Sequence, residues 1–147
     1  MDEQKRSMQI NAKPATCFQI IADFEKYPAW QKRVKEVTIL EQEHGRAVIV
    51  EYALDATLKT INYTLRYSYD EKDPKKLLLS WDYVGGDLKK IVGSYIFEEV
   101  AEGKTNVTFY LQIEIGQWVP NFVMHAFREG SMQETLEALK KRAESLK

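Results

Sequence analysis

The stretch Ile61-Asn62-Tyr63-Thr64-Leu65-Arg66-Tyr67-Ser68-Tyr69 alternates large apolar or aromatic residues with polar ones along its whole length. Successive side chains of a β-strand point to opposite faces, so this pattern predicts a strand over residues 58–69 with one buried face and one solvated face. A shift of one residue would exchange the two faces. The stretch therefore fixes which face of the predicted sheet is inside.

Further runs of period two surround this stretch and are separated by polar turns. They cover residues 37–39, 47–54, 76–83, 88–99 and 105–115, and the turns fall at His44-Gly45, 70–74, 85–87 and 102–104. Parallel strands would need crossover segments between them, whereas these connections are short. The sequence therefore predicts an antiparallel meander.

Helical patterns flank the meander on both sides. A weakly alternating run, Ser7–Asn11, is the expected first strand. It leads to Pro14, which suits the first turn of a helix that continues to Phe24. Pro28 should stop this helix because the residue before proline avoids the α region, and a short second turn or helix should follow over 30–34. Residues 120–146 are rich in strong helix formers. We expect an α+β fold in which a curved sheet wraps a long C-terminal helix.

The apolar register of the strands is strongly aromatic. Its predicted members are Val48, Val50, Tyr52, Leu54, Ile61, Tyr63, Leu65, Tyr67, Tyr69, Leu77, Leu79, Trp81, Tyr83, Ile91, Gly93, Tyr95, Phe97, Val107, Phe109, Leu111, Ile113 and Ile115. Any one such ring is most simply a core residue. Together, so many rings with polar tips favour a partly hollow apolar pocket with a few hydrogen-bonding groups.

The charged residues of the strands are predicted on the opposite face. Glu51, Arg66 and Asp82 all belong to the solvated register. General acid–base or nucleophilic catalysis needs a titratable group in the site, and the inner register offers phenol hydroxyls and an indole N–H instead. We therefore expect no catalytic residue, and binding rather than catalysis.

Composition narrows the class of protein further. The chain has 147 residues, a length that suits one domain over 1–147. Its net charge of -1 lacks the excess of positive charge that binding to phosphates needs, which disfavours nucleic acid as a partner. Cys17 is its sole cysteine, so no internal disulfide can form, and a structural zinc site would have to draw on that thiol, two histidines and carboxylates. We expect no metal site and no cofactor. No apolar run approaches the roughly 18 residues of a membrane span, and we expect a cytoplasmic protein.

The predicted C-terminal helix changes its apolar face. Residues 119–127 and residues 132–146 place their apolar side chains on opposite sides, and we expect a kink at Glu129-Gly130-Ser131. The apolar segment 118–130 has three interpretations: a pocket lid, a dimer contact, or a transient contact with a membrane surface. His44 and His125 are interpreted as surface or hydrogen-bonded histidines.

Three segments carry a resemblance to a known family. They are the run Ile21-Ala22-Asp23-Phe24-Glu25-Lys26-Tyr27-Pro28-Ala29-Trp30 with Val34–Val37, the strand Gly93-Ser94-Tyr95-Ile96-Phe97, and the strand Thr105-Asn106-Val107-Thr108-Phe109. In these segments the chain resembles the START-like (SRPBCC) superfamily of polyketide cyclases/dehydrases and coenzyme Q-binding proteins. The likeness extends in order over essentially the whole chain.

The resemblance implies a helix-grip fold of about seven antiparallel strands around the C-terminal helix, with a cavity for hydrophobic molecules. Tyr27, Pro28 and Trp30 would shape one end of that cavity. Combined with the aromatic register, this gives the candidate ligand-binding residues Trp30, Tyr52, Tyr63, Tyr67, Trp81, Tyr83, Tyr95, Phe97, Phe109, Phe122, Val123 and Phe127.

The sequence leads to one main functional hypothesis and two alternatives. The main hypothesis is a monomeric or homodimeric carrier of a lipid, quinone/isoprenoid or polyketide-like ligand. The first alternative is a polyketide-type cyclase or dehydratase in which tyrosines, or Arg66 and Asp82 if the register were inverted, polarise a substrate carbonyl. It would need an ionisable group facing the cavity. The second is a protein-interaction module that uses the apolar segment 118–127.

Overall fold

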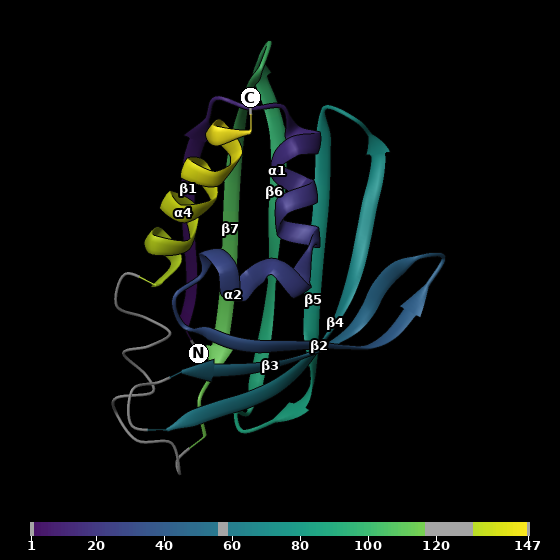
Figure 1. Cartoon of the computed structure of the whole chain (residues 1–147), viewed down its shortest axis with the longest axis vertical. Coiled ribbons are helices and arrows are strands. Elements are labelled where there is room, and N and C mark those ends of the chain that lie inside the picture. Colours follow the sequence, from purple (N-terminus) through teal and green to yellow (C-terminus); the bar gives the residue numbers. More distant parts are fainter. Residues whose placement is uncertain (1, 56–58, 117–130, 147) are drawn as a thin grey trace.

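The computed structural model describes residues 2–55, 59–116 and 131–146. Seven antiparallel strands form one open sheet in the order β1-β7-β6-β5-β4-β3-β2 (Figure 1). Their bounds are β1 Asp2–Ile10, β2 Val34–Glu43, β3 Arg46–Asp55, β4 Thr60–Asp73, β5 Lys76–Gly86, β6 Lys90–Ala101 and β7 Lys104–Glu114. Every strand from β2 to β7 pairs with its neighbour in sequence, as the predicted meander requires.

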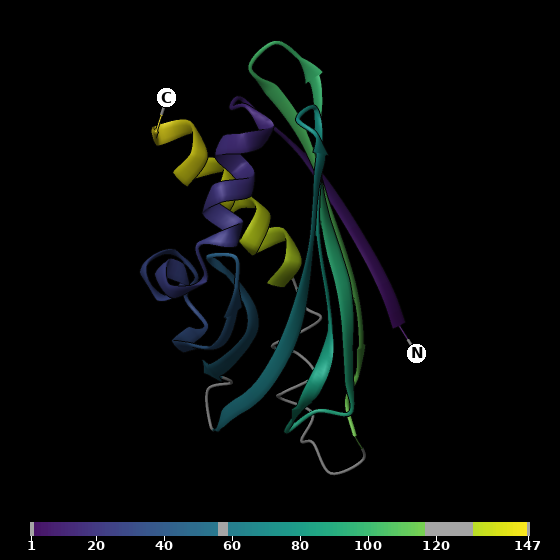
Figure 2. The ribbon, with the colours of Figure 1, turned by 90° about the vertical axis from the view of Figure 1, so that its right-hand side faces the viewer.

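The helices lie on the concave side of this sheet. They are α1 (Pro14–Ala22), the 3-10 turn η1 (Phe24–Lys26), α2 (Tyr27–Trp30) and the C-terminal α4 (Ser131–Ser145). Figure 2 shows α1 and α4 against one face of the sheet, while β2 and β3 curl around toward α2. The α+β helix-grip prediction is therefore confirmed.

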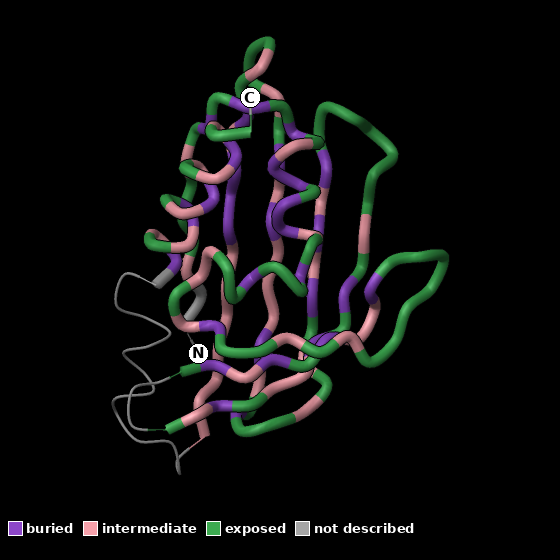
Figure 3. The backbone as a smooth tube through the Cα atoms, in the orientation of Figure 1, coloured by how far each residue is buried: buried purple, intermediate pink, exposed green. Residues whose placement is uncertain are grey.

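Burial alternates along the strands in the predicted register (Figure 3). In β4, Ile61, Leu65 and Tyr67 are buried, whereas Asn62, Arg66 and Ser68 are exposed. The same alternation places Arg66 directly opposite Asp82 on the solvated face, where their side chains form an ion pair of 3.8 Å. The register is not inverted, and these two charges do not reach the interior.

One predicted core position in β3 is wrong. Val48 is half-buried, while its neighbour Ala47 is buried, with 8% of its surface exposed. The register of β2 against β3 shifts beside this site, between Ile39 and Gln42, and the carbonyl of Ala47 accepts a hydrogen bond from the Tyr69 hydroxyl at 2.5 Å. The bulged pairing and this bond turn the start of β3 away from simple alternation.

The hairpin between β2 and β3 has the turn that the sequence predicts. His44 and Gly45 both have positive φ, 53° and 77°. Two consecutive residues with positive φ form a type I′ turn, whose twist matches that of the strands it joins. This tight turn aligns β3 with β2 so that Val50, Tyr52 and Leu54 face inward.

Two boundaries near the N-terminus differ from the prediction. β1 begins at Asp2 instead of Ser7, because its polar residues pair through the backbone with β7, from Asp2 opposite Ile113 to Ile10 opposite Thr105. The short helix is α2, not residues 30–34. Tyr27 is helical although it precedes Pro28, since its side chain is buried and its hydroxyl donates to the Ile21 carbonyl at 2.5 Å.

The C-terminal helix packs through one stripe of side chains. Met132, Leu136, Leu139 and Ala143 are buried in the core, as the helical spacing predicts. Leu146 was expected on the same stripe but lies beyond the end of α4 and is 64% exposed. The predicted kink and the apolar segment 118–130 lie outside the described residues, apart from Ser131, where α4 begins. Within the described ranges, no helix is long and apolar enough to cross a membrane.

Candidate functional site

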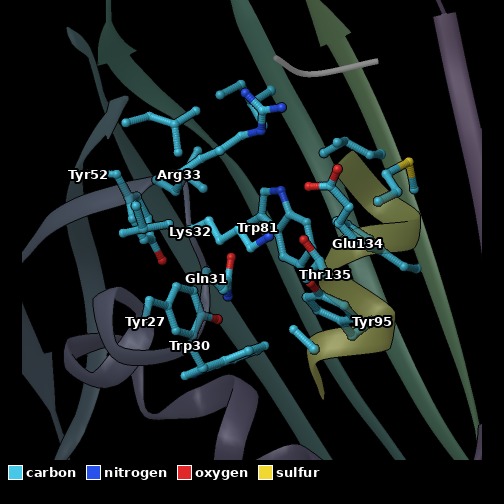
Figure 4. A pocket seen from close by; sticks show the side chains of 18 of the residues that line it. Tyr27, Trp30, Gln31, Lys32, Arg33, Tyr52, Trp81, Tyr95, Glu134 and Thr135 are labelled. Atoms are coloured by element: carbon cyan, nitrogen blue, oxygen red, sulfur yellow. The ribbon is translucent and has the colours of Figure 1, made fainter. Parts of the chain in front are cut away.

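A pocket of about 440 Å³ opens between the concave face of the sheet, α2 and α4 (Figure 4). Its walls come from separate parts of the chain that the curvature of the sheet brings together. The described residues that line it are Tyr27, Trp30, Gln31, Lys32, Arg33, Val34, Tyr52, Leu54, Tyr63, Leu65, Tyr67, Trp81, Ile91, Tyr95, Phe109, Leu111, Ile113, Met132, Glu134, Thr135, Glu137, Ala138 and Lys141.

The first wall of the pocket, here called the aromatic wall, consists of Trp81 on β5, Tyr95 on β6 and Phe109 on β7. The ring centroids of Trp81 and Tyr95 lie 5.3 Å apart, and those of Tyr95 and Phe109 lie 4.4 Å apart in a stacked arrangement. Gly93, which pairs with Trp81 across β5 and β6, leaves room for the indole. A Cβ at Gly93 would lie 2.5 Å from Trp81 Cζ2 and 2.5 Å from the Tyr110 carbonyl oxygen. The missing side chain thus leaves the space that the Trp81 indole occupies.

A tyrosine cluster on β3, β4 and α2 forms a second wall. The hydroxyls of Tyr52 and Tyr67 are 2.5 Å apart and hydrogen-bond to each other, with either able to donate. The rings of Tyr63 and Tyr27 both stack on the ring of Tyr52, with centroid distances of 5.2 Å and 6.1 Å. Two hydroxyls carry two protons, and their mutual bond uses one of them. Since neither bonds to another described residue, the pair retains one O–H donor.

Burial keeps these phenols neutral. Loss of solvation on burial raises the pKa of Tyr27, Tyr52 and Tyr67 well above the usual value of 10.0. The same cause raises the pKa of Tyr63 and Tyr95. A group that stays protonated cannot act as a base, but it can donate a hydrogen bond to a carbonyl, carboxylate or hydroxyl oxygen. The tyrosines therefore supply donors and apolar surface.

The structure brings most of the predicted ligand-binding residues to this pocket. Its lining includes Trp30, Tyr52, Tyr63, Tyr67, Trp81, Tyr95 and Phe109. Tyr27, which the family resemblance implied, also lines it, whereas Pro28 is exposed and does not.

Two predicted residues lie elsewhere, and three are not described. Phe97 is fully buried in the core against Phe18, with ring centroids 5.6 Å apart. The Tyr83 hydroxyl binds the backbone of Leu88, donating to its carbonyl at 2.7 Å and accepting from its N–H at 3.0 Å. Phe122, Val123 and Phe127 lie outside the described residues.

The sequence analysis missed the charged residues at the mouth of the pocket. Lys32 and Arg33 come from the loop between α2 and β2, and Glu134, Glu137 and Lys141 come from α4. The last three are spaced three and four residues apart, so they form a stripe beside the buried stripe of α4. This spacing is visible in the sequence, but nothing in it says that the stripe faces a cavity.

Two buried hydrogen-bond donors have no partner in the part of the chain that the structure describes. They are Trp30 Nε1 and Arg33 Nε, and both residues line the pocket. Buried polar groups in proteins are nearly always hydrogen-bonded, so these two donors are exceptions among the described residues. No group of three or more His, Cys, Asp or Glu side chains in residues 2–55, 59–116 and 131–146 is arranged to hold a metal ion.

Comparisons with known proteins identify the fold and the family. The START superfamily protein from Mycobacterium smegmatis has a TM-score of 0.83 to this chain at 18% identity, covering 99% of both chains. The Zhui aromatase/cyclase from Streptomyces sp. R1128 gives 0.81 at 14% identity, covering 97% of this chain and 93% of that one. The STAR-related lipid transfer protein from Xanthomonas axonopodis gives 0.80 at 12% identity, covering 97% and 85%.

At these identities the superpositions establish a shared fold and leave the ligand open. No curated protein matches the sequence. A family model described as polyketide cyclase/dehydrase and lipid transport matches residues 1–144. That match covers nearly the whole chain and agrees with the fold, so the chain belongs to the polyketide cyclase/dehydrase and lipid transport family.

Proposed function

We propose that this protein binds and carries a hydrophobic small molecule in the pocket between the sheet, α2 and α4. The observation that carries the proposal is an aromatic wall of Trp81, Tyr95 and Phe109 facing open space instead of further core. Burial of an apolar ligand on such a wall supplies affinity, and a few fixed polar groups orient it. The name of the family, which includes lipid transport, is compatible with this role.

The Tyr52 and Tyr67 hydroxyls give this binding a direction. Among the described residues the second O–H of this pair has no acceptor, and both side chains line the pocket, so a ligand oxygen that accepts a hydrogen bond would be placed there. A ligand with a flat or extended apolar body and an acceptor oxygen suits both walls. Lipids, quinones and polyketide-like molecules all meet that description.

A first experiment asks what the protein holds after native purification. Extraction with organic solvent and mass spectrometry should recover a hydrophobic molecule in near-stoichiometric amount. In parallel, the neutral fluorescent probe 1-aminoanthracene should bind saturably to ligand-stripped protein. Ala138 lines the pocket from α4, so Ala138→Trp should block the probe by filling its space.

A matched control keeps that experiment decisive. Gln19 is exposed on α1 and does not line the pocket, so Gln19→Trp should bind the probe like the unmodified protein. Equal probe binding by all three proteins, with no molecule recovered on extraction, would refute the proposal.

The structure also supports a second candidate, a cyclase or dehydratase. This activity needs an ionisable group facing the cavity, and Glu134, Glu137 and Lys141 line it. A test reaction is the dehydration of 4-hydroxy-4-phenyl-2-butanone, in which a base removes the proton next to the carbonyl and the hydroxyl leaves as water. Enzymatic turnover that is lost in Glu134→Gln would establish catalysis. A rate equal to that in buffer would leave binding as the function.

The protein-interaction alternative concerns residues 118–127, which lie outside the described residues. It stays a prediction. Size-exclusion chromatography of the protein with and without Phe122→Asp and Phe127→Asp tests it, because loss of an apolar contact surface would change the measured oligomeric state.

A further inference from the structure

Arg33 stands on a backbone that three hydrogen bonds hold in place. The N–H of Gln31 donates to the Tyr27 carbonyl at 2.7 Å, and the N–H of Val34 donates to the Gln31 carbonyl at 3.2 Å. The Arg33 carbonyl in turn accepts from the N–H of Asp55 on β3 at 2.6 Å. The loop that carries Arg33 is therefore anchored to both α2 and β3, and its side chain starts from a fixed position at the pocket.

The Arg33 side chain has a hydrogen-bond donor without an acceptor among the described residues. A guanidinium is always charged and can only donate hydrogen bonds. Arg33 is half-buried, its Nε is shielded from solvent, and that Nε has no partner among the described residues. Removing such a donor from water without replacing its acceptor is unfavourable. A negatively charged partner from outside the chain would remove this cost.

The other charges at the mouth do not supply that partner. Glu134 extends from α4 on the far side of the pocket from the loop of Arg33 (Figure 4), and no ion pair joins them. Glu137 accepts a hydrogen bond from Gln133 Nε2 at 3.2 Å. Lys32, next to Arg33, is an exposed second cation on the same loop. The loop side of the mouth thus presents two positive charges that face the cavity without a counterion in the described chain.

We infer that the ligand is a hydrophobic acid whose carboxylate binds Arg33 while its apolar body lies on the aromatic wall. The inference rests on the proposed binding function and names the chemical class of the ligand. Carboxylate and guanidinium match in charge and geometry, and such charge-assisted bonds are stronger than neutral ones. A neutral ligand of the same shape could accept a hydrogen bond from Arg33 Nε–H through a carbonyl oxygen, but it would leave the guanidinium charge without a counterion.

A matched pair of ligands tests the inference. Fluorescence titration at neutral pH compares 2-naphthoate with its methyl ester, which has the same ring system without the charge. We expect the unmodified protein to bind the acid at least about tenfold more tightly than the ester. Arg33→Gln should abolish this preference while retaining affinity for the ester. Arg33→Lys, which keeps the charge and loses Nε–H, should give an intermediate preference.

Two further variants separate a local effect from a general one. Glu134→Gln removes the facing negative charge from the pocket lining and should increase the preference for the acid over the ester. Lys35→Gln removes an exposed cation that binds Thr60 Oγ1 and does not line the pocket, and it should leave the preference unchanged.

The outcomes also separate this inference from the proposed function. Equal binding of acid and ester by the unmodified protein overturns the assignment of a carboxylate to Arg33 and leaves the hydrophobic pocket intact. A preference that survives in Arg33→Gln has the same consequence for Arg33. Failure of both ligands to bind, with 1-aminoanthracene also unbound, overturns the proposed function as well.

Discussion

Because the Tyr52 and Tyr67 hydroxyls are hydrogen-bonded to each other, we expect the effects of Tyr52→Phe and Tyr67→Phe on the free energy of unfolding to be non-additive. Both side chains are buried, with 3% and 7% of their surface exposed, and the oxygens lie 2.5 Å apart. Tyr52→Phe removes one hydroxyl and leaves the other buried without its partner, and Tyr67→Phe does the same in reverse. An abandoned buried hydroxyl costs about 1–3 kcal/mol.

The position of the pair at the pocket decides where in that range the effect falls. Since the pocket can admit water to one side of the hydroxyls, we expect each single variant to lose about 1–2 kcal/mol of the free energy of unfolding. For a chain of this length, that is a fall in Tm of about 3–4 °C for each kcal/mol. The double variant removes both polar groups at once and should be less destabilised than the sum of the two singles.

Urea denaturation followed by circular dichroism measures all four proteins of this cycle. Tyr110→Phe is the control, because Tyr110 faces the other side of β7 and its ring contacts Lys5 instead of the pocket. We expect it to change stability by less than about 0.5 kcal/mol. Strictly additive effects of the Tyr52 and Tyr67 substitutions would show that the two hydroxyls are not coupled. The assignment of one shared and one spare proton to the pair would then be wrong.

Three further predictions follow from the packing and the charges. Gly93→Ala should destabilise the fold by about 1–3 kcal/mol, because the added Cβ would overlap Trp81 and a carbonyl oxygen. In the same urea titration, Gly85→Ala should be tolerated, because its Cβ would meet nothing within 4 Å. Arg66→Ala should change the free energy of unfolding by less than about 0.5 kcal/mol and leave ligand affinity unchanged, because its ion pair with Asp82 is exposed. A loss of activity or binding would instead indicate that this face of the sheet has a functional role. The raised pKa values of the buried tyrosines mean that the folded state holds their protons more tightly than the unfolded state. Their contribution to stability should therefore be constant below about pH 10 and be lost above it. Tyrosinate absorbance that rises to full ionisation before the protein unfolds would contradict this.

The sheet and its inner face could be predicted because a single pattern determines both. Period two over residues 61–69 fixed which residues face inward, and short turns such as His44-Gly45 fixed the order of the strands. The early boundary of β1 could not be predicted in this way, since Asp2–Arg6 carry no apolar alternation and pair through their backbone with β7. Backbone pairing leaves little trace in side-chain patterns.

Only the aromatic part of the site could be predicted from the sequence, for a related reason. The aromatic wall lies on the strands whose register could be worked out, so Trp81, Tyr95 and Phe109 were identified as lining residues. The charged mouth depends on how α4 and the loop carrying Arg33 meet across the sheet, which is a tertiary contact without a local signal. Phe97 shows the converse limit, because alternation predicts an inward side chain without saying whether it meets a cavity or α1.

The pairing of β1 with β7 has a consequence for how the chain folds. Ile10 lies opposite Thr105 and Asp2 opposite Ile113, so the first strand finds its partner among the last strand residues of the sequence. During synthesis, the hairpins from β2 to β6 can form one after another, whereas β1 must wait until Lys104–Glu114 has left the ribosome. Contacts this distant in sequence slow folding, because a large loop must close before they form. Docking of β1 onto β7 should therefore be a late step, with the meander already assembled.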